Sequence, residues 1–174
     1  QPIDRRALQK EVQIHSILKH DNVLAFLGSV EYAASAPDNY VRGLYILLEL
    51  CAGGDLFDKI APDVGVDEDL AHFYFTQLMS GLTYIHGQGV THRDIKPDNV
   101  ILEANGGLKL VDLGVARLRL AEEFAEAEAP GTAGYKAPEM YAGESGDAAT
   151  DQFALGVTLY RLFTRTYPWG EVDP

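Results

Sequence analysis

A polar segment of nine residues, 91–99, lies between two well-defined patterns and constrains the fold more than any other feature of this chain. Before it, residues 67–86 carry apolar side chains at helical spacing, which predicts a long amphipathic helix. After it, two short apolar stretches, 100–102 and 108–111, flank an Asn-Gly-Gly turn and predict a pair of strands. The polar segment therefore joins a long helix to a short hairpin.

The other elements are predicted from the same periodicities and from turn residues. They are a helix over 4–19, strands over 23–32 and 43–50 with a loop over 33–39 between them, a short helix over 55–60, and a helix over 149–164 that is apolar nearly all round and is therefore expected to be buried. Because strands dominate the first part and helices the rest, the predicted fold class is α+β.

Composition limits the class of protein. The 174 residues suffice for one domain with a sizeable core. No apolar run approaches the roughly 20 residues that span a membrane, and the first residues show no secretory pattern. The single cysteine, Cys51, excludes an internal disulfide framework and fits a reducing intracellular compartment. The net charge of −12 argues against nucleic-acid binding. We expect a cytoplasmic protein with neither nucleic-acid nor membrane partners; its oligomeric state stays open.

The segment 91–99 reads Thr-His-Arg-Asp-Ile-Lys-Pro-Asp-Asn and resembles the catalytic loop of protein kinases, His-Arg-Asp followed five residues after the Asp by Asn. The resemblance implies that Asp94 orients a hydroxyl nucleophile and takes its proton. It implies that Lys96 reaches the γ-phosphate of ATP and that Asn99 offers an oxygen to a metal ion. His92 and Arg93 complete the loop as structural residues. The alternative is a charged surface loop with this sequence by chance.

A second motif follows the hairpin. Asp112-Leu113-Gly114 stands where kinases carry Asp-Phe-Gly, which implies that Asp112 ligates Mg²⁺ together with Asn99, and that Gly114 has a structural role. Taken alone, an Asp-x-Gly after a strand is usually a turn. Leu113 replaces a Phe that packs rather than reacts, so metal binding is still expected.

Residues 131–139 resemble the Gly-Thr-x-x-Tyr-x-Ala-Pro-Glu stretch that closes the kinase activation segment and ends here at Glu139. Thr132 together with Lys96 is typical of serine/threonine kinases. Asp151 matches a family aspartate that binds the backbone of the catalytic loop, although a carboxylate at a helix start can equally be an N-cap.

The nucleotide site is implied by residues further upstream. Glu11 would be the glutamate that pairs with the ATP-anchoring lysine, although a glutamate on an amphipathic helix is often only solvated. Backbone groups of Glu49 and Cys51 would bind adenine at the hinge, and Ile101 would form the floor beneath it. Asp55 falls where the family contacts ribose or a substrate arginine. ATP and Mg²⁺ are the implied cofactors.

The resemblance covers the entire chain, 1–174, as a partial protein kinase domain. Residues 1–50 would be a remnant of the small lobe and hinge, with the regulatory helix and two or more strands. Residues 51–174 would be a mostly helical large lobe, truncated at its C-terminal end. The Gly-rich loop and anchoring lysine would precede Gln1. We therefore expect this fragment to have little or no activity, since phosphate clamping supplies much of the catalysis.

Two kinds of kinase are similar in different parts of the chain. Residues 44–99 resemble the checkpoint effector kinase that answers DNA damage, for which a nuclear location is the alternative. Residues from 108 onward resemble bacterial kinases fused to a PP2C-type phosphatase. The eukaryotic and bacterial branches both stay open, and the reaction is the same in both.

The activation segment carries no hydroxyl residue between Asp112 and Gly131, so a phosphate has no attachment point there. We expect Arg93 to bind a carboxylate of that segment instead, which would keep the kinase ordered without phosphorylation. The alternative is a solvated acidic loop. The four candidate carboxylates are Glu122, Glu123, Glu126 and Glu128.

Three classes of function fit these patterns. The first is a serine/threonine protein kinase that acts on a protein substrate with a basic residue upstream of the target hydroxyl, because Asp55 and Asp98 stand where arginine-directed kinases hold such a residue. The second is a pseudokinase-like scaffold that binds nucleotide or protein. The third is a purely structural helical domain, which leaves the polar segment 91–99 unexplained.

Overall fold

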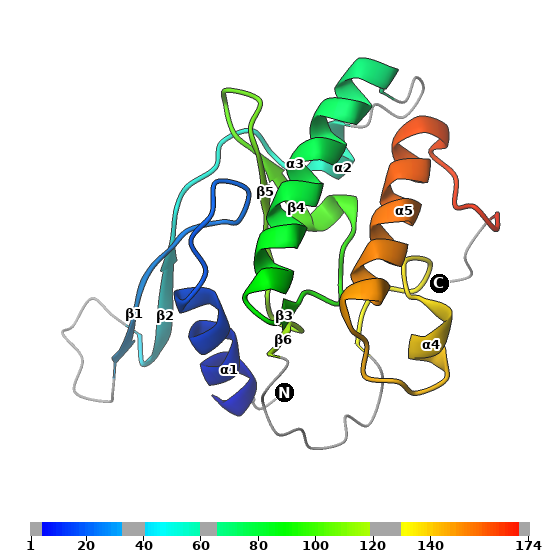
Figure 1. Ribbon diagram of the computed structural model, residues 1–174. Coiled ribbons are helices and arrows are strands. Elements are labelled where there is room, and N and C mark those ends of the chain that lie inside the picture. Colours follow the sequence, from blue (N-terminus) through cyan, green and yellow to red (C-terminus); the bar gives the residue numbers. More distant parts are fainter. Residues whose placement is uncertain (1–4, 33–40, 60–65, 119–129, 171–174) are drawn as a thin grey trace.

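Two groups of elements make up the fold (Figure 1). The smaller group contains helix α1 (Arg5–Ser16) beside the antiparallel strands β1 (Phe26–Tyr32) and β2 (Gly43–Leu48). The two strands pair along their whole length, with one bulge near the start of β1. The computed structural model describes residues 5–32, 41–59, 66–118 and 130–170.

The larger group is mostly helical and surrounds α3 (Glu68–Gly87). Helix α5 (Ala148–Thr164) packs beside α3, and the antiparallel hairpin of β4 (Val100–Leu102) and β5 (Leu108–Leu110) packs on another side of it. The remaining elements are short: α2 (Leu56–Lys59), β3 (Val90–Thr91) paired with β6 (Arg117–Leu118), the 3-10 helix η1 (Pro97–Asn99) and α4 (Pro138–Tyr141).

Helix α3 begins and ends within one residue of its predicted bounds because its sequence signals are strong. The Asp67 side chain accepts a hydrogen bond from the Leu70 amide at 2.9 Å and caps the helix. Its apolar stripe is buried, and Gly81 lets the helix approach the preceding loop, since a Cβ there would lie 2.8 Å from the Asn22 oxygen. The buried stripe consists of Ala71, Tyr74, Leu78, Leu82 and Ile85.

Strand β5 joins the two groups. The Leu24 amide donates to the Leu110 oxygen and the Leu110 amide donates to the Asn22 oxygen, both at 2.9 Å, and Val23 bridges Leu110 in parallel. Buried side chains from both groups form one continuous hydrophobic core around this point. The loop after α1 is thus tied by backbone hydrogen bonds to the hairpin that follows the segment 91–99.

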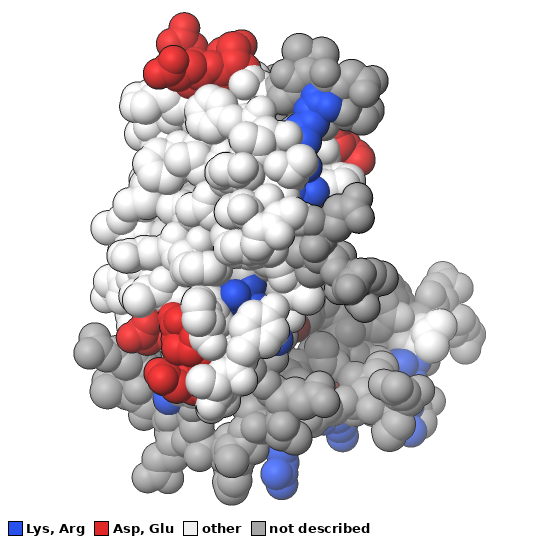
Figure 2. All heavy atoms as spheres, turned by 90° about the vertical axis from the view of Figure 1, so that its right-hand side faces the viewer, with Lys and Arg blue, Asp and Glu red and all other residues white. Residues whose placement is uncertain are grey.

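Helix α5 was expected to be buried all round, and this is only half correct. Its N-cap is Asp147, and its inner side is buried against α3. On its outer side, however, Tyr160 is 40% and Phe163 46% exposed. Figure 2, which faces the side of the molecule where α5 lies, shows a surface with few charged side chains. Apolar residues thus occupy both sides of α5 although only one side is covered.

The α+β class is confirmed, while several element ends differ from prediction. Helix α1 ends at Ser16, β1 begins only at Phe26, and β2 ends at Leu48. The predicted loop over 33–39 lies outside the described residues. Within the described part of the chain, no helix is long and apolar enough to cross a membrane.

Candidate active site

The segment 91–99 runs from β3 to β4 and is anchored from below by buried side chains. His92 and Ile95 are fully buried, and His92 Nε2 lies 2.9 Å from the Val111 oxygen. Arg93 adopts a left-handed backbone with φ of 68°, which is unfavourable for a residue with a side chain and clusters at functional sites. These contacts hold the residues on either side of Asp94 in place.

The carboxylate of Asp94 is the centre of a closed polar network. Its Oδ1 accepts hydrogen bonds from the Thr132 amide at 2.9 Å and the Thr132 hydroxyl at 2.7 Å. Its Oδ2 accepts one from Asn99 Nδ2 at 3.0 Å and lies 3.2 Å from Lys96 Nζ. Lys96 Nζ also donates to the Thr132 hydroxyl at 2.7 Å. The structure thus brings together four residues that the sequence assigned to the site.

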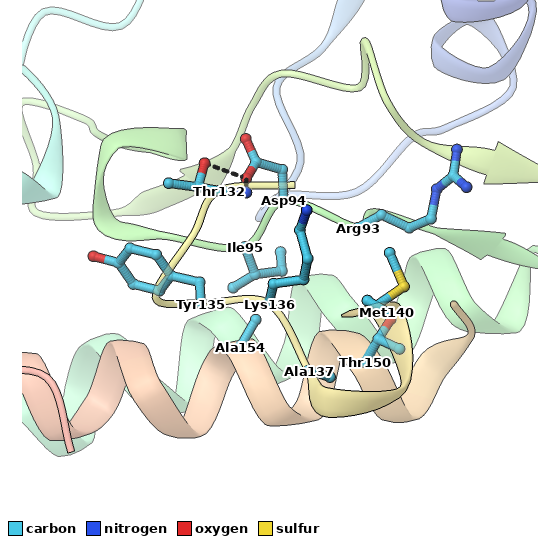
Figure 3. A pocket seen from close by; sticks show the side chains of 10 residues that line it. All are labelled: Arg93, Asp94, Ile95, Thr132, Tyr135, Lys136, Ala137, Met140, Thr150 and Ala154. Carbon is cyan, nitrogen blue, oxygen red and sulfur yellow. Dashed lines mark hydrogen bonds between the residues drawn. The ribbon is translucent and has the colours of Figure 1, made fainter. Parts of the chain in front are cut away.

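Figure 3 shows Asp94 and Thr132 facing each other above α5, with the Lys136 side chain beside them and Arg93 directed away. The cavity that these residues line holds about 10 Å³, room for about one water molecule. A substrate side chain therefore cannot enter from below. It would have to approach Asp94 from the outer side of the loop.

Asp151 is fully buried and supports the loop from α5. Its Oδ1 accepts from the Arg93 amide and its Oδ2 from the His92 amide, both at 2.8 Å, and His86 Nε2 lies 2.8 Å from Oδ2. The N-cap of α5 is Asp147, four residues earlier, so the alternative interpretation of Asp151 as an N-cap is wrong.

The side chain of Arg93 points toward the activation segment and the loop after α4. Its Nε donates to the Val115 oxygen at 2.8 Å and its Nη1 to the Ser145 oxygen at 3.1 Å. Arg117 donates to the Ser145 hydroxyl. The four glutamates predicted to pair with Arg93 lie outside the described residues, so that pairing stays a prediction.

Asn99 and Asp112 have the donor groups that Mg²⁺ prefers. Because Asn99 Nδ2 donates to the Asp94 oxygen and carboxylate, its amide oxygen faces the other way. Asp112 is exposed, with φ of 62°, and Oδ1 accepts from the Gly114 amide at 3.2 Å. The Val111 backbone amide donates a hydrogen bond to the Asn99 backbone carbonyl at 3.0 Å. The two candidate ligands, Asn99 and Asp112, therefore lie on backbone segments that are next to each other. Hard oxygen donors at this place fit a magnesium ion.

In the described part of the chain, no group of three or more histidine, cysteine, aspartate or glutamate side chains could hold a metal ion. Asn99 and Asp112 would therefore supply only part of a ligand set. In kinases, phosphate oxygens of the nucleotide supply further ligands to the ion.

Glu11 on α1 faces the same region. A Cβ built on Gly114 would lie 3.1 Å from Asp112 Oδ1 and 3.7 Å from Glu11 Oε2, so both carboxylates flank that glycine. Burial, and then the nearby charge of Asp112, raise the pKa of Glu11, although His15 acts in the opposite direction. Among the described residues Glu11 forms no ion pair, so its charge is destabilising as the structure stands.

Replacing Glu11 by Gln should raise the melting temperature at neutral pH. A carboxyl whose pKa is raised on folding contributes stability below its ordinary pKa of 4.5, and that contribution is lost as the pH rises through the raised value. Gln cannot ionise, so its advantage should shrink as the pH falls. Thermal unfolding between about pH 4 and 8, a range that includes the ordinary pKa of 4.5, tests this.

The matched control is Glu68→Gln. Glu68 is exposed at the start of α3, where its charge favours the helix dipole, so its removal should slightly lower the melting temperature. A Glu11→Gln chain that is less stable than the unmodified chain at neutral pH would show that Glu11 has a cationic partner.

The predicted hinge follows β2. The Glu49 amide donates to the Ala25 oxygen at 3.0 Å, and its side chain accepts from the Ala25 amide at 2.7 Å. Cys51 is half-buried, and burial, followed by the charge of Glu49, raises the pKa of its thiol. No backbone hydrogen bond of Cys51 occurs among the described residues. Within the described part of the chain, its amide and carbonyl thus have no backbone partner that a ligand would have to displace.

Asp55 and Ile101 lie opposite each other in an isolated antiparallel bridge. Asp55 Oδ1 accepts from the Asp58 amide at 2.8 Å and caps α2. Part of the Asp55 carboxylate is thus already used for a local structural purpose, and Ile101 is half-buried in β4 beneath the hinge.

Glu139 lies apart from the catalytic network. It is half-buried in α4 and lines a cavity of about 430 Å³ together with Arg117, Glu144, Ser145 and Asp147.

Sequence reasoning missed two charged residues of this region. Lys109 is buried in β5, inside an apolar pattern, where a single charge was the only signal. Arg161 in α5 donates to the hydroxyls of Tyr135 and Tyr167 and lies 4.4 Å above the Tyr167 ring. Burial raises the pKa of the Tyr135 phenol, so it stays neutral at physiological pH. The tyrosines belong to loops whose meeting the sequence does not reveal.

Comparison with known proteins gives one consistent family. The model described as "Protein kinase domain" matches residues 1–173. "Serine/threonine-protein kinase CHK1" of Mycosarcoma maydis is 47% identical over 98% of this chain, and the chk1 kinase of Schizosaccharomyces pombe is 38% identical over 95%. "CBL-interacting serine/threonine-protein kinase 9" of Arabidopsis thaliana is 40% identical over 94%. The chain spans about a third of the length of these relatives, 32%, 32% and 36% respectively.

Proposed function

The chain belongs to the serine/threonine protein kinase family, and on that premise we propose that it carries the large-lobe catalytic machinery which transfers the γ-phosphate of ATP to a Ser or Thr hydroxyl of a protein. In this proposal residues 1–50 supply part of the small lobe and the hinge, and residues 51–174 supply part of the large lobe. The observation that carries the proposal is the network of Asp94, Lys96, Thr132 and Asn99.

The Thr132 hydroxyl shows what this network does to an alcohol. It donates a hydrogen bond to Asp94 and accepts one from Lys96. A substrate hydroxyl that approached from the outer side would meet the same carboxylate and the same cation. Asp94 would orient it and take its proton, while Lys96 would offset the negative charge of the incoming phosphoryl group.

Magnesium, when bound with the nucleotide, neutralises phosphate charge during transfer. Asn99 and Asp112 are the residues of this chain that would hold it. Asn99 has a second task, because its amide also holds the Asp94 carboxylate at 3.0 Å. The metal ligand and the base are thereby kept in a fixed relation.

Replacing Thr132 by Val should lower kcat for peptide phosphorylation about tenfold to a hundredfold, because Asp94 and Lys96 lose the hydroxyl that bridges them and are less well positioned. Thr132→Ser keeps the hydroxyl and is the matched control, with activity close to that of the unmodified protein. Phosphate transfer to a Ser/Thr peptide library is the measurement. Equal rates for the Val variant would mean that Thr132 is only a neighbour of the site.

A basic residue upstream of the target hydroxyl is the proposed substrate feature. Asp98 is exposed on η1, and Asp55 is half-buried beside α2. Both carboxylates lie on segments that adjoin the catalytic network. A peptide array with and without arginine before the Ser or Thr tests this, and an array with no preference for arginine contradicts it.

The second candidate function is a scaffold that binds nucleotide without turning it over. It is favoured by one observation: among the described residues Glu11 forms no ion pair with a lysine or arginine, and burial and then the charge of Asp112 raise its pKa. We propose on this ground that the 174-residue chain alone has weak or no activity. A thermal shift with ATP, with and without Mg²⁺, combined with an ATP-turnover assay, separates the three classes. Binding with turnover supports the kinase, binding alone the scaffold, and neither a purely structural domain.

The proposed cellular role is that of a checkpoint-type kinase, acting in the cytoplasm or nucleus on protein substrates. It is supported by the similarity to the CHK1 kinases over nearly the entire chain. The resemblance of the later residues to bacterial kinase–phosphatase fusions stays a prediction that these relatives do not support.

A further inference from the structure

A buried lysine connects the hinge to the large lobe. All three residues of β5 are buried, and the middle one, Lys109, is only 7% exposed. Its Nζ lies 2.9 Å from Glu49 Oε1 and 3.7 Å from Glu103 Oε1, and it donates to the Asp21 oxygen at 3.1 Å. Lys109, Glu49 and Glu103 form what we call the Lys109 cluster.

The cluster fixes the first residue of the hinge. Glu49 Oε1 accepts a hydrogen bond from the Ala25 amide as well as the ion pair from Lys109, and the Glu49 amide donates to the Ala25 oxygen. Three separate contacts therefore hold Glu49. Two of them come from the loop that precedes β1, and the third comes from β5 in the large lobe.

The other end of the hinge is held as well. The Gly53 amide donates to the Leu102 oxygen at 2.9 Å, and the Leu102 amide donates to the Gly54 oxygen at 2.8 Å. A Cβ on Gly53 would lie only 2.3 Å from the Leu102 oxygen, so the backbones are in close approach. Between these two anchors only residues 50–52 bridge the gap, and Leu50 there is 95% exposed.

The charges of the cluster support one another. Burial by itself would raise the pKa of Glu49, but the hydrogen bonds from Lys109 and from the Ala25 amide lower it overall. Burial would lower the pKa of Lys109, but Glu49 and then Glu103 raise it. Both side chains are thus charged at neutral pH, and their ion pair is intact.

We propose that Lys109 is a positioning residue for the nucleotide: through Glu49 it holds the hinge in the conformation that presents the backbone groups of Glu49 and Cys51 to adenine. This inference rests on the proposed function. A segment that is ordered before binding avoids the entropy cost of ordering on binding, so removal of Lys109 should weaken binding of the purine. A lysine that only stabilised the fold would not act selectively on the hinge.

The test compares Lys109→Met, Lys109→Arg and Glu49→Gln with the unmodified chain. The matched control is Lys19→Met, which removes the same charge from an exposed position. Two quantities are measured: the Kd for adenosine, which lacks phosphates, by calorimetry, and amide hydrogen exchange over residues 48–54. Adenosine isolates the purine contacts from the phosphate contacts.

Lys109→Met should raise the Kd for adenosine about five- to tenfold and speed hinge exchange, whereas Lys109→Arg should retain most of the affinity. Combining Lys109→Met with Glu49→Gln should add little to either single change, because both break the same ion pair. Lys19→Met should leave both measurements unchanged. The Glu49 side chain is 26% exposed, so water can hydrate the carboxylate that Lys109→Met leaves unpaired, and a folded variant is expected. Glu49→Gln provides a second route, because its amide oxygen can still accept from Ala25.

Equal adenosine affinity and equal hinge exchange in Lys109→Met would overturn the inference and leave the proposed function standing. Fully additive effects of the two substitutions would also overturn it, because the two residues would then act independently. If the unmodified chain binds neither adenosine nor ATP with Mg²⁺, the proposed function fails and this inference fails with it.

Discussion

Replacing Asp94 by Asn should lower kcat for phosphoryl transfer by about a hundred- to ten-thousandfold, the range expected when a positioned general base is lost. The carboxylate is the only group in the described network that can take a proton from a substrate hydroxyl at neutral pH. Asn has the same shape, so Thr132 can still donate to its amide oxygen. Nucleotide binding should therefore change much less than kcat.

The measurement is phosphate transfer to a peptide, made with a form of the protein whose unmodified version shows measurable turnover. Asp69→Asn, an exposed substitution in the first turn of α3, is the control for loss of one negative charge. If Asp94→Asn retained more than about a tenth of the activity, Asp94 would not be the base, since general-base catalysis alone contributes at least about a hundredfold.

Replacing Asp151 by Ala should destabilise the fold by about 3–5 kcal/mol, because two buried backbone amides lose a charged acceptor. Those amides belong to His92 and Arg93, so the damage falls on the catalytic loop itself. His86 loses its partner at the same time. Urea unfolding of the 174-residue chain gives the free energy of unfolding, and hydrogen exchange at residues 92 and 93 shows where protection is lost.

The control lies on the same helix. Asp147→Ala removes the N-cap of α5, an exposed contact with the Ala149 amide, and should cost about 1 kcal/mol. The ratio of the two effects tests the assignment. Equal losses for Asp147→Ala and Asp151→Ala would mean that Asp151 acts only through its own helix and not through the loop.

The residues that gather around Asp94 could be named from the sequence, whereas the contacts that support them could not. Asp94, Lys96 and Asn99 are close in sequence and Thr132 belongs to a recognisable motif, so the residues of the network could be named in advance. Lys109, by contrast, has no motif of its own. Its importance arises because three separate segments meet at its ammonium group, and long-range meetings of this kind leave no periodic signal.

The same distinction holds for the fold. Helix α3 was predicted within one residue because its cap and its apolar stripe are both local. Strands β3 and β6, of two residues each, are too short to show alternation and were missed. Asp147 and Asp151 are both aspartates at the start of one helix, and only burial shows that the first is the cap and the second the support of the loop.

The backbone connection at Leu110 has a mechanical consequence. The loop after α1 forms backbone hydrogen bonds with a single strand residue, Leu110. This connection would act as a pivot between the two groups of elements. In a rigid rotation about a pivot, displacement grows with distance from it. Asp112, two residues away, would then move little, while the far end of the β1–β2 hairpin would sweep through the largest arc. The group of α1, β1 and β2 could then rock while Asp112, the proposed metal ligand, stayed almost stationary.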